Sequence, residues 1–490
     1  MSIFCIFLGP LGFTSDVFAQ TNTVVSQDFS ELDRFITSGM EQTDMPGIAV
    51  SIIEDGDVLF SKGYGIASND GRPVTDKTQF QIGSGSKSFT ALAILQLVDE
   101  GRLELDRPIR DYIPDFRPSD QQRSSEITTR HLLTHRSGLS AIDGNRYQYE
   151  RYAESDTLAI AIDRFNSARL RTDPGQKFEY SNANYAILGH LLEVIDNASF
   201  EDIIDSRIFQ PLGMTRSYVQ RHPIDQSLEA SGYRHFFGMN LETRFTSSRM
   251  MAPANGVVST VEDLGKYLTA LSKAETDMLS PYSRDAMFAG LPAFKNTDYG
   301  FGWGIERHSE KAFVSHEGLN SGFKSVIGFY PETGQTYVVL SNRSSGVSDS
   351  FVLSILDVAL HRSPLDFEYK RSSYLTVLGL CFVSVVLLGG LYFNVYVWKK
   401  GLRQKQNARR SGWKRVKVFV GAFVLFAVSY LTWVLLPSIN DITLRSIYPF
   451  YPDLAVGLGA TGAIALIWGS FLLVTFLYGL KKQITQEKMG

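Results

Sequence analysis

The sequence predicts an α+β domain, in which an antiparallel sheet is flanked by helices and accompanied by a helical region, followed by three transmembrane helices. Three observations support this fold class. Strand-like runs occur near both ends of the first 362 residues, the stretch between about 105 and 290 is mostly helical or loop-like, and three long apolar runs follow. Strands at both ends with helices between them indicate one sheet assembled from the two ends of the domain.

Local patterns predict the individual elements. Residues 29–40 have the apolar spacing of an amphipathic helix, and strand-like runs at 47–54 and 58–66 flank Asp55-Gly56, a strong signal for a two-residue hairpin turn. The remaining runs are typical of a helix from Ser84 to Gly101, of strands at 303–307, 312–316, 323–330 and 336–341, and of a helix at 350–361.

Composition limits the classes of function. The chain has 490 residues, 44% hydrophobic content and a net charge of −3, so its charge gives no indication of a nucleic-acid partner. Its two cysteines, Cys5 and Cys381, lie in apolar stretches outside the domain, which therefore has no disulfide and no cysteine-based metal site. We expect no cofactor and no metal.

The N-terminus has the features of a secretory signal peptide over residues 1–19. An apolar core at 3–13 precedes a small residue, Ala19, although no Lys or Arg stands before that core. This pattern predicts export of the domain, which we place at residues 27–362.

Three apolar runs at 374–398, 418–436 and 454–480 are long enough to cross a bilayer and contain no Asp, Glu, Lys, Arg or His. The first connection between them is dense in Lys and Arg, the second is nearly neutral, and the tail begins with Lys481-Lys482. The positive-inside rule therefore predicts a multi-pass membrane protein with its domain outside the cytoplasm. A lipid bilayer is an expected partner, and the uncharged spans disfavour a transporter.

The run Ser84-Gly85-Ser86-Lys87 opens a periodic apolar stretch, so Ser84 and Lys87 should lie one helical turn apart. A serine hydroxyl needs a neighbouring base to attack a carbonyl, and a desolvated lysine with a lowered pKa can be that base. The two residues therefore indicate the nucleophile and the activating partner of an acyl-transfer enzyme. The spacing alone is weak, because Ser321 and Ser411 share it and an ordinary helix with a serine cap fits it too.

Tyr180-Ser181-Asn182 can complete such a site. A tyrosine beside a cationic lysine is more easily deprotonated, so Tyr180 can act as a general base. Asn182 can bind the lysine or a substrate amide. The alternative interpretation is a turn that caps the next helix.

His316-Glu317-Gly318 follows a strand-like run, and on a strand His316 and Gly318 face the same side. Gly318 lets a substrate approach the backbone. The N–H of Leu319, together with the N–H of Ser84, can form an oxyanion hole. The alternative interpretation is a structural histidine.

These three motifs, in this order, resemble those of class C β-lactamases and penicillin-binding-protein-like serine hydrolases, over about residues 27–362. The stretches LLTHRSGL, PGQKFEYSNANYAILG and GVVSTVEDLGKYL add to the resemblance, and the three spans resemble a membrane-anchored subgroup of Gram-positive bacteria. The resemblance implies a mixed α/β sheet beside a helical region. It also implies that Ser84 is acylated, that Lys87 and Tyr180 share proton transfer, and that Asn182 positions the reacting groups. The substrates implied are esters, D-amino-acyl groups or peptidoglycan-type peptides.

The chain departs from the class C pattern at one motif. His-Glu-Gly stands where those enzymes have Lys-Thr-Gly, whose lysine supplies a cation for the substrate carboxylate. A histidine that is neutral at pH 7 weakens the case for efficient β-lactam hydrolysis. If His316 must be cationic, activity on carboxylate substrates should fall as the pH rises past its pKa.

Three alternatives stay open. The chain can be a non-catalytic protein that binds or senses cell-wall fragments or β-lactams, or it can be a weak β-lactamase. It can also be a metalloenzyme that uses His131 and His135, which have i, i+4 spacing, although no further ligand motif accompanies them.

Overall fold

A computed structural model describes residues 28–146, 157–220, 228–237, 239–243, 248–273, 276–308, 311–344, 346–364, 369–403, 412–436, 447–448 and 451–487. The expected signal peptide at residues 1–19 lies outside them. The described residues form two compact units, a mixed α/β unit up to residue 364 and a helical unit from residue 369.

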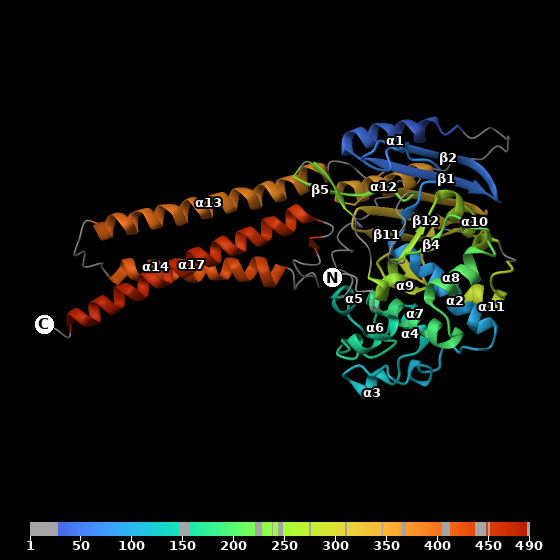
Figure 1. Cartoon of the computed structure of the whole chain (residues 1–490), viewed down its shortest axis with the longest axis horizontal. Helices are drawn as coiled ribbons and strands as arrows, with labels where there is room; N and C mark the ends of the chain where they lie inside the picture. The colour runs from blue at the N-terminus through green and yellow to red at the C-terminus, as the bar shows by residue number, and fades with distance from the viewer. Residues whose placement is uncertain are drawn as a thin grey trace. The chain divides into compact units, whose positions relative to one another are not determined.

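An eight-stranded antiparallel sheet forms the centre of the first unit (Figure 1), with strand order β2-β1-β13-β12-β11-β10-β9-β8. The strands are β1 (Gly47–Glu54), β2 (Asp57–Gly65), β8 (Leu291–Pro292), β9 (Thr297–Tyr299), β10 (Gly304–His308), β11 (Lys311–Asn320), β12 (Phe323–Phe329) and β13 (Gln335–Ser341). Ile48 of β1 pairs with Ser341 of β13, so the two ends of the domain build one sheet, which confirms the predicted fold class. Asp55 and Gly56 have positive φ angles of 52° and 99°, which suits a tight hairpin turn between β1 and β2.

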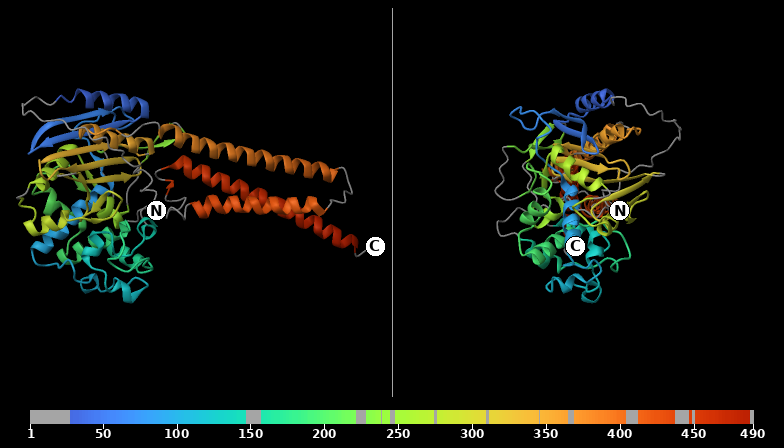
Figure 2. Two further views of the ribbon diagram at one scale, coloured as in Figure 1. Left: turned by 180° about the vertical axis from the view of Figure 1, so that it is seen from behind. Right: turned by 90° about the vertical axis from the view of Figure 1, so that its right-hand side faces the viewer.

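Helices cover both faces of this sheet (Figures 1 and 2). Side chains alternate along β1: Val50 packs in a cluster with residues of α1 (Ser30–Thr43) and α12 (Gly346–Ala359), whereas Ala49 belongs to the larger core on the other face. That larger core includes apolar residues of α10 (Val261–Ser272) and α2 (Ser86–Asp99).

The helical region lies between the two groups of strands in sequence. Its helices are α3 (Gln121–Ser124), α4 (Thr129–Leu133), α5 (Ala141–Arg146), α6 (Leu158–Phe165), α7 (Asn182–Asp196), α8 (Phe200–Ile204), α9 (Ala252–Asn255) and α11 (Pro281–Phe288), with 3-10 turns η2 (Gly83–Gly85), η3 (Ile109–Asp111) and η5 (Arg249–Met251) and a π turn η4 (Asp205–Phe209). Two small sheets join β3 (Phe80–Gln81), β7 (Val257–Ser259) and β4 (Tyr218–Val219), and β14 (Arg343–Ser344), β5 (Gly232–Phe236) and β6 (Met239–Thr243).

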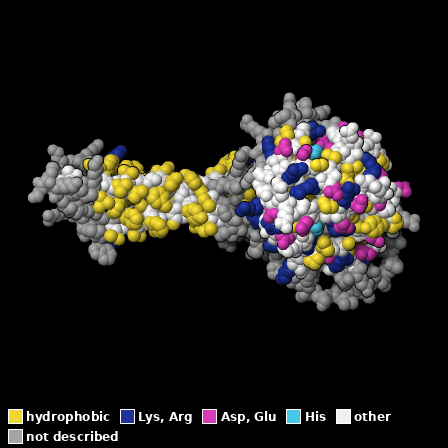
Figure 3. All heavy atoms as spheres, turned by 90° about the horizontal axis from the view of Figure 1, so that it is seen from below, with side chains coloured by type: hydrophobic (Ala, Val, Ile, Leu, Met, Phe, Trp, Pro, Cys, Tyr) yellow, Lys and Arg dark blue, Asp and Glu magenta, His cyan; other side chains and the backbone are white. Residues whose placement is uncertain are grey.

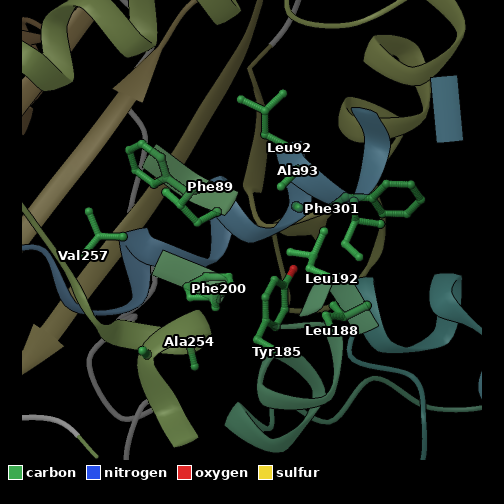
Figure 4. Packing of buried hydrophobic residues seen from close by; sticks show 14 of the residues in the cluster. Phe89, Leu92, Ala93, Tyr185, Leu188, Leu192, Phe200, Ala254, Val257 and Phe301 are labelled. Atoms are coloured by element: carbon green, nitrogen blue, oxygen red, sulfur yellow. The ribbon is translucent and has the colours of Figure 1, made fainter. Parts of the chain in front are cut away.

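The helix α2 is buried on nearly all sides, since Phe89 and Leu92 are both fully inaccessible to solvent. Tyr185 and Leu188 of α7 belong to the same core cluster, together with Ala254 of α9 (Figure 4). A helix held in this way is a rigid base for the residues at its N-terminal end.

The helical unit contains α13 (Tyr369–Arg403), α14 (Gly412–Tyr430), the π turn η6 (Leu431–Leu435) and α17 (Pro452–Glu487). Three helical stretches, Leu378–Lys400, Val416–Leu435 and Pro452–Tyr478, are long and apolar enough to cross a membrane. They overlap the three spans that the sequence predicts, and hydrophobic side chains dominate their surface in Figure 3. Polar groups bond between helices: Ser384 and Thr461 hydroxyls lie 2.9 Å apart, and the Trp433 indole donates to the carbonyl of Gly459 at 3.1 Å.

Candidate active site

Ser84 lies in the 3-10 turn η2, just before α2. The helix starts at Ser86 rather than at Ser84, because Gly83 has a positive φ of 53° and the chain enters the helix through a tighter turn. The hydroxyl of Ser86 donates to the carbonyl of Gly83 at 2.7 Å and accepts from the N–H of Val257 at 2.9 Å. These bonds hold the turn that presents Ser84, which is 7% exposed.

Lys87 is completely buried, and its Nζ has two hydrogen-bond partners. Nζ donates to Ser84 Oγ at 3.1 Å and to the carbonyl of Ala254 at 2.9 Å. Removal from water lowers the pKa of Lys87 well below its usual value, because burial disfavours the charged form. Ser84 and Lys87 therefore lie together as the sequence predicts, and the neutral form of the lysine is favoured.

Tyr180 lies against Lys87, with the centre of its ring 4.9 Å from Nζ. Its hydroxyl is hydrogen-bonded to Ser84, which lowers its pKa, but burial has the larger effect and raises the pKa of Tyr180 above the usual value. The expected easy deprotonation beside a cationic lysine is thus contradicted, because the same burial favours the neutral form of Lys87. The geometry suits Tyr180 as a hydroxyl that passes a proton and not as a resting tyrosinate.

Asn182 is the first residue of α7 and is 7% exposed. Its amide donates to Asn145 Oδ1 at 3.3 Å. The neighbouring Ser181 does not cap the helix with its side chain and donates instead to the carbonyl of Ser140 at 2.7 Å. The segment that carries Tyr180 and Asn182 is therefore fixed to the chain around α5.

β11 runs with its backbone against the Ser84 turn. A Cβ placed on Gly83 would lie 2.5 Å from the Leu319 nitrogen, and one placed on Gly318 would lie 1.9 Å from the carbonyl oxygen of Ile82. Only glycine fits at either position without displacing the backbone. This approach brings the Leu319 N–H next to the turn, as a two-donor oxyanion hole with Ser84 requires.

His316 is 7% exposed, and both of its ring nitrogens lie close to protein oxygens. Nε2 lies 3.1 Å from the Tyr299 hydroxyl, and Nδ1 lies 2.6 Å from the carbonyl oxygen of Glu317. Burial is the main cause that lowers the pKa of His316 to about 3. The ring is therefore neutral near pH 7, as expected when a histidine replaces the lysine of the class C motif, and it supplies no cation for a substrate carboxylate.

The sequence patterns do not place four residues of this neighbourhood in the active site: Ala254, His135, Tyr185 and Tyr299. Of these, His135 is a candidate there only as a metal ligand. Ala254 contributes only its carbonyl, which leaves no trace in a side-chain motif. The three others pack with Tyr180 around Lys87, with ring centres of His135 and Tyr180 4.3 Å apart. The aromatic and glycine-rich run from Tyr299 to Trp303, just before a strand, is a signal that could have pointed to Tyr299.

His131 and His135 do not share a helix face. The helix α4 ends at Leu133, and His135 has a left-handed φ of 55°. Its Nδ1 accepts from the N–H of Ser181 at 3.2 Å. Within the described residues no three His, Cys, Asp or Glu side chains are grouped as metal ligands. In the second Ser-x-x-Lys pattern, Lys324 forms an ion pair with Glu317.

A family model described as Beta-lactamase matches residues 32–360. Among curated proteins, Protein flp of Staphylococcus aureus is 23% identical over 423 residues, which cover 82% of each chain. The Unguisins hydrolase ungD' of Aspergillus campestris is 24% identical over 363 residues, 69% of this chain and 66% of that protein.

Two solved structures are similar to this chain in fold and in sequence. The octameric penicillin-binding protein homologue from Pyrococcus abyssi has a TM-score of 0.60 and 30% identity, over 69% of this chain and 78% of that one. The D-amino acid amidase from Ochrobactrum anthropi, solved with L-phenylalanine amide, has a TM-score of 0.58 and 27% identity, over 68% of this chain and 98% of that one.

Proposed function

The chain belongs to the beta-lactamase family, and we propose that it is a membrane-anchored serine hydrolase that forms an acyl-enzyme on Ser84. One observation carries the proposal: the buried Nζ of Lys87 lies 3.1 Å from Ser84 Oγ, in surroundings that favour its neutral form. A neutral amine at hydrogen-bond distance from a serine hydroxyl is a competent general base.

The proposed acylation uses groups already described. Lys87 takes the proton of Ser84 as Oγ attacks the substrate carbonyl, and the N–H groups of Ser84 and Leu319 bind the negative oxygen that forms. The bond to the leaving group then breaks, and the leaving group receives a proton from Lys87 by way of the Tyr180 hydroxyl. Water, deprotonated by the same lysine, hydrolyses the resulting ester and regenerates Ser84.

The neutral His316 supports a narrower substrate class. A site that binds a carboxylate needs a cation or several donors toward it, and both nitrogens of His316 are occupied by Tyr299 and the Glu317 carbonyl. The side of the site that His316 forms therefore suits esters and amides of amino acids, which have no carboxylate beside the scissile bond. It suits β-lactams and peptides that end in a free carboxylate less well. The similarity to a D-amino acid amidase supports the same class.

We infer that the domain lies outside the cytoplasm from the charge of the segments that flank the apolar helices. The residues between the first two apolar helices, 399–417, are rich in Lys and Arg, which favours their retention in the cytoplasm. A cysteine substituted for the exposed Ser38 should react with a membrane-impermeant maleimide in intact cells, whereas one substituted for Ser411 should react only after lysis. The reverse pattern would overturn this topology.

Intact mass measurement tests the catalytic proposal. The full chain in detergent micelles and its Ser84→Ala variant are incubated with an activated ester of a D-amino acid and, separately, with a β-lactam. Turnover of the ester that depends on Ser84 supports the hydrolase. A lasting β-lactam adduct without turnover would favour a binding or sensing protein, and equal turnover by the variant would refute the assignment of Ser84.

A further inference from the structure

Tyr299 contacts His316 through its hydroxyl, and its ring packs near the rings of His135 and Tyr180. The residue ends β9, is 3% exposed, and places its oxygen 3.1 Å from Nε2 of His316. The other ring nitrogen, Nδ1, lies 2.6 Å from the carbonyl oxygen of Glu317. The ring of His316 is thus held at both ends by protein atoms.

These contacts determine which ring nitrogen of His316 carries the proton. A carbonyl oxygen only accepts hydrogen bonds, so Nδ1 of His316 carries a hydrogen. In a neutral imidazole the second nitrogen is then a lone pair, and the Tyr299 hydroxyl must donate to it. The nearby Tyr185 does not change this result, because its own hydroxyl donates to the carbonyl of Leu133 at 3.0 Å. If the Tyr299 hydroxyl donated to Tyr185 instead, a lone pair on its oxygen would face the lone pair of His316 Nε2 across 3.1 Å, which is repulsive.

We propose that Tyr299 is a positioning residue for the reaction at Ser84, because its hydroxyl fixes the proton of His316 on Nδ1 and keeps this wall of the site uncharged. The proposal rests on the proposed serine hydrolase function. Tyr299 acts through His316, and no contact with the substrate is required of it.

The surroundings explain why the charge of His316 matters. The titratable and charged groups around it are Lys87 of α2, Lys324 of β12, Glu317 of β11, Tyr180 before α7, His135 after α4 and Tyr299 of β9. Glu317 and Lys324 form an ion pair, so their charges largely offset each other. Lys87 becomes cationic when it takes the proton of Ser84, and a second cation on His316 would oppose that step.

The pH dependence of kcat/KM tests this role. We expect the Tyr299→Phe variant of the full chain, in detergent micelles with an uncharged ester, to lose activity more steeply on the acid side than the wild type. The Tyr299 hydroxyl can donate only to the unprotonated form of Nε2, so its loss should raise the pKa of His316 although the ring stays buried. Protonation of the ring then adds a second proton to the acid limb, about tenfold more loss per pH unit. Adding His316→Gln to the variant should restore the slope of a single proton.

Tyr337→Phe is the matched control, because that hydroxyl donates to Gln335 at 3.2 Å in β13 and belongs to the other core cluster. It should keep the wild-type pH profile. A Tyr299→Phe variant that loses rate but keeps the wild-type profile would overturn the positioning role while leaving the Ser84 assignment intact. Failure of Ser84→Ala to abolish turnover would instead overturn the hydrolase itself.

A measurement on the wild type covers the case in which Tyr299→Phe does not fold. Long-range ¹H–¹⁵N correlation of histidine-labelled protein, with His316 assigned by its loss in His316→Gln, reports which ring nitrogen carries the proton. We expect a protonated Nδ1 and an unprotonated Nε2 near neutral pH. A proton on Nε2 would refute the proposal.

Discussion

Ser325 Oγ donates a hydrogen bond of 2.8 Å to the carbonyl of Ile82, which fastens β12 to the turn that carries Ser84. The same carbonyl lies against Gly318 of β11. Two neighbouring strands of the sheet therefore determine where the nucleophile stands.

Gly318→Ala should disrupt this contact. The added Cβ would lie 1.9 Å from the Ile82 carbonyl oxygen and 2.2 Å from Ser325 Oγ, so β11 and the turn must move apart, at a cost of roughly 1–3 kcal/mol. We expect a lower Tm and a large loss of acylation rate. Gly304→Ala is the control in the same sheet, because its Cβ would meet no atom closer than 3.3 Å. Equal effects of the two changes would contradict the importance of the contact.

Lys87→Arg should abolish the general base while keeping a long cationic side chain. Arginine stays protonated, so it cannot take the proton of Ser84, and we expect the acylation rate to fall at least about a hundredfold. Stopped-flow release of a chromogenic leaving group measures this rate. Lys266→Arg, on the partly exposed side of α10, should be silent. An active Lys87→Arg variant would assign the base to another residue.

Lys87→Met should stabilise the protein at neutral pH. Between the lowered pKa of native Lys87 and its usual value of 10.5, the unfolded chain binds a proton that the native chain does not. Native stability therefore falls as the pH is lowered through this range, and Met removes that dependence. We expect the variant to have the higher Tm at pH about 7, with a difference that shrinks as the pH approaches about 10. A constant difference would mean that Lys87 is charged in the native state.

Two esters test the charge at His316. They are identical except that one carries a free carboxylate where the other carries the methylamide of that carboxylate. Because the pKa of His316 is lowered to about 3, the ring gives no attraction to the carboxylate at any pH from about 5 to about 9. We expect the methylamide to have the higher kcat/KM, by a ratio that does not vary over this range. His316→Lys should shift the ratio toward the carboxylate. A wild-type preference for the carboxylate that disappears as the pH rises would restore the cationic role.

Local signals explain what could be predicted. The hairpin at Asp55-Gly56, the spacing of Ser84 and Lys87, and the three apolar helices each depend on residues close together in the chain. The antiparallel sheet built from both ends of the domain could be inferred because strand patterns occur at both ends.

The protonation of the site could not be predicted, because it depends on burial by distant segments. His316 loses its charge chiefly through burial, and burial also keeps the proton on Tyr180. The second partner of Lys87 is a main-chain carbonyl at Ala254, which any residue type can provide. The start of α2 shifted by two residues because a positive φ at Gly83 produces a 3-10 turn first.

The pairing of Ile48 with Ser341 has a consequence for the order of events during synthesis. β1 and β2 leave the ribosome early but find their neighbour β13 only when nearly the whole domain has been made, so the sheet closes late and at a high entropic cost. In the sequence, β13 is followed by the short strand β14 and by α12, and α13 starts at Tyr369. The nascent domain therefore completes its core at about the stage when its first apolar helix is being translated, and chaperones have that entire interval in which to hold the open chain.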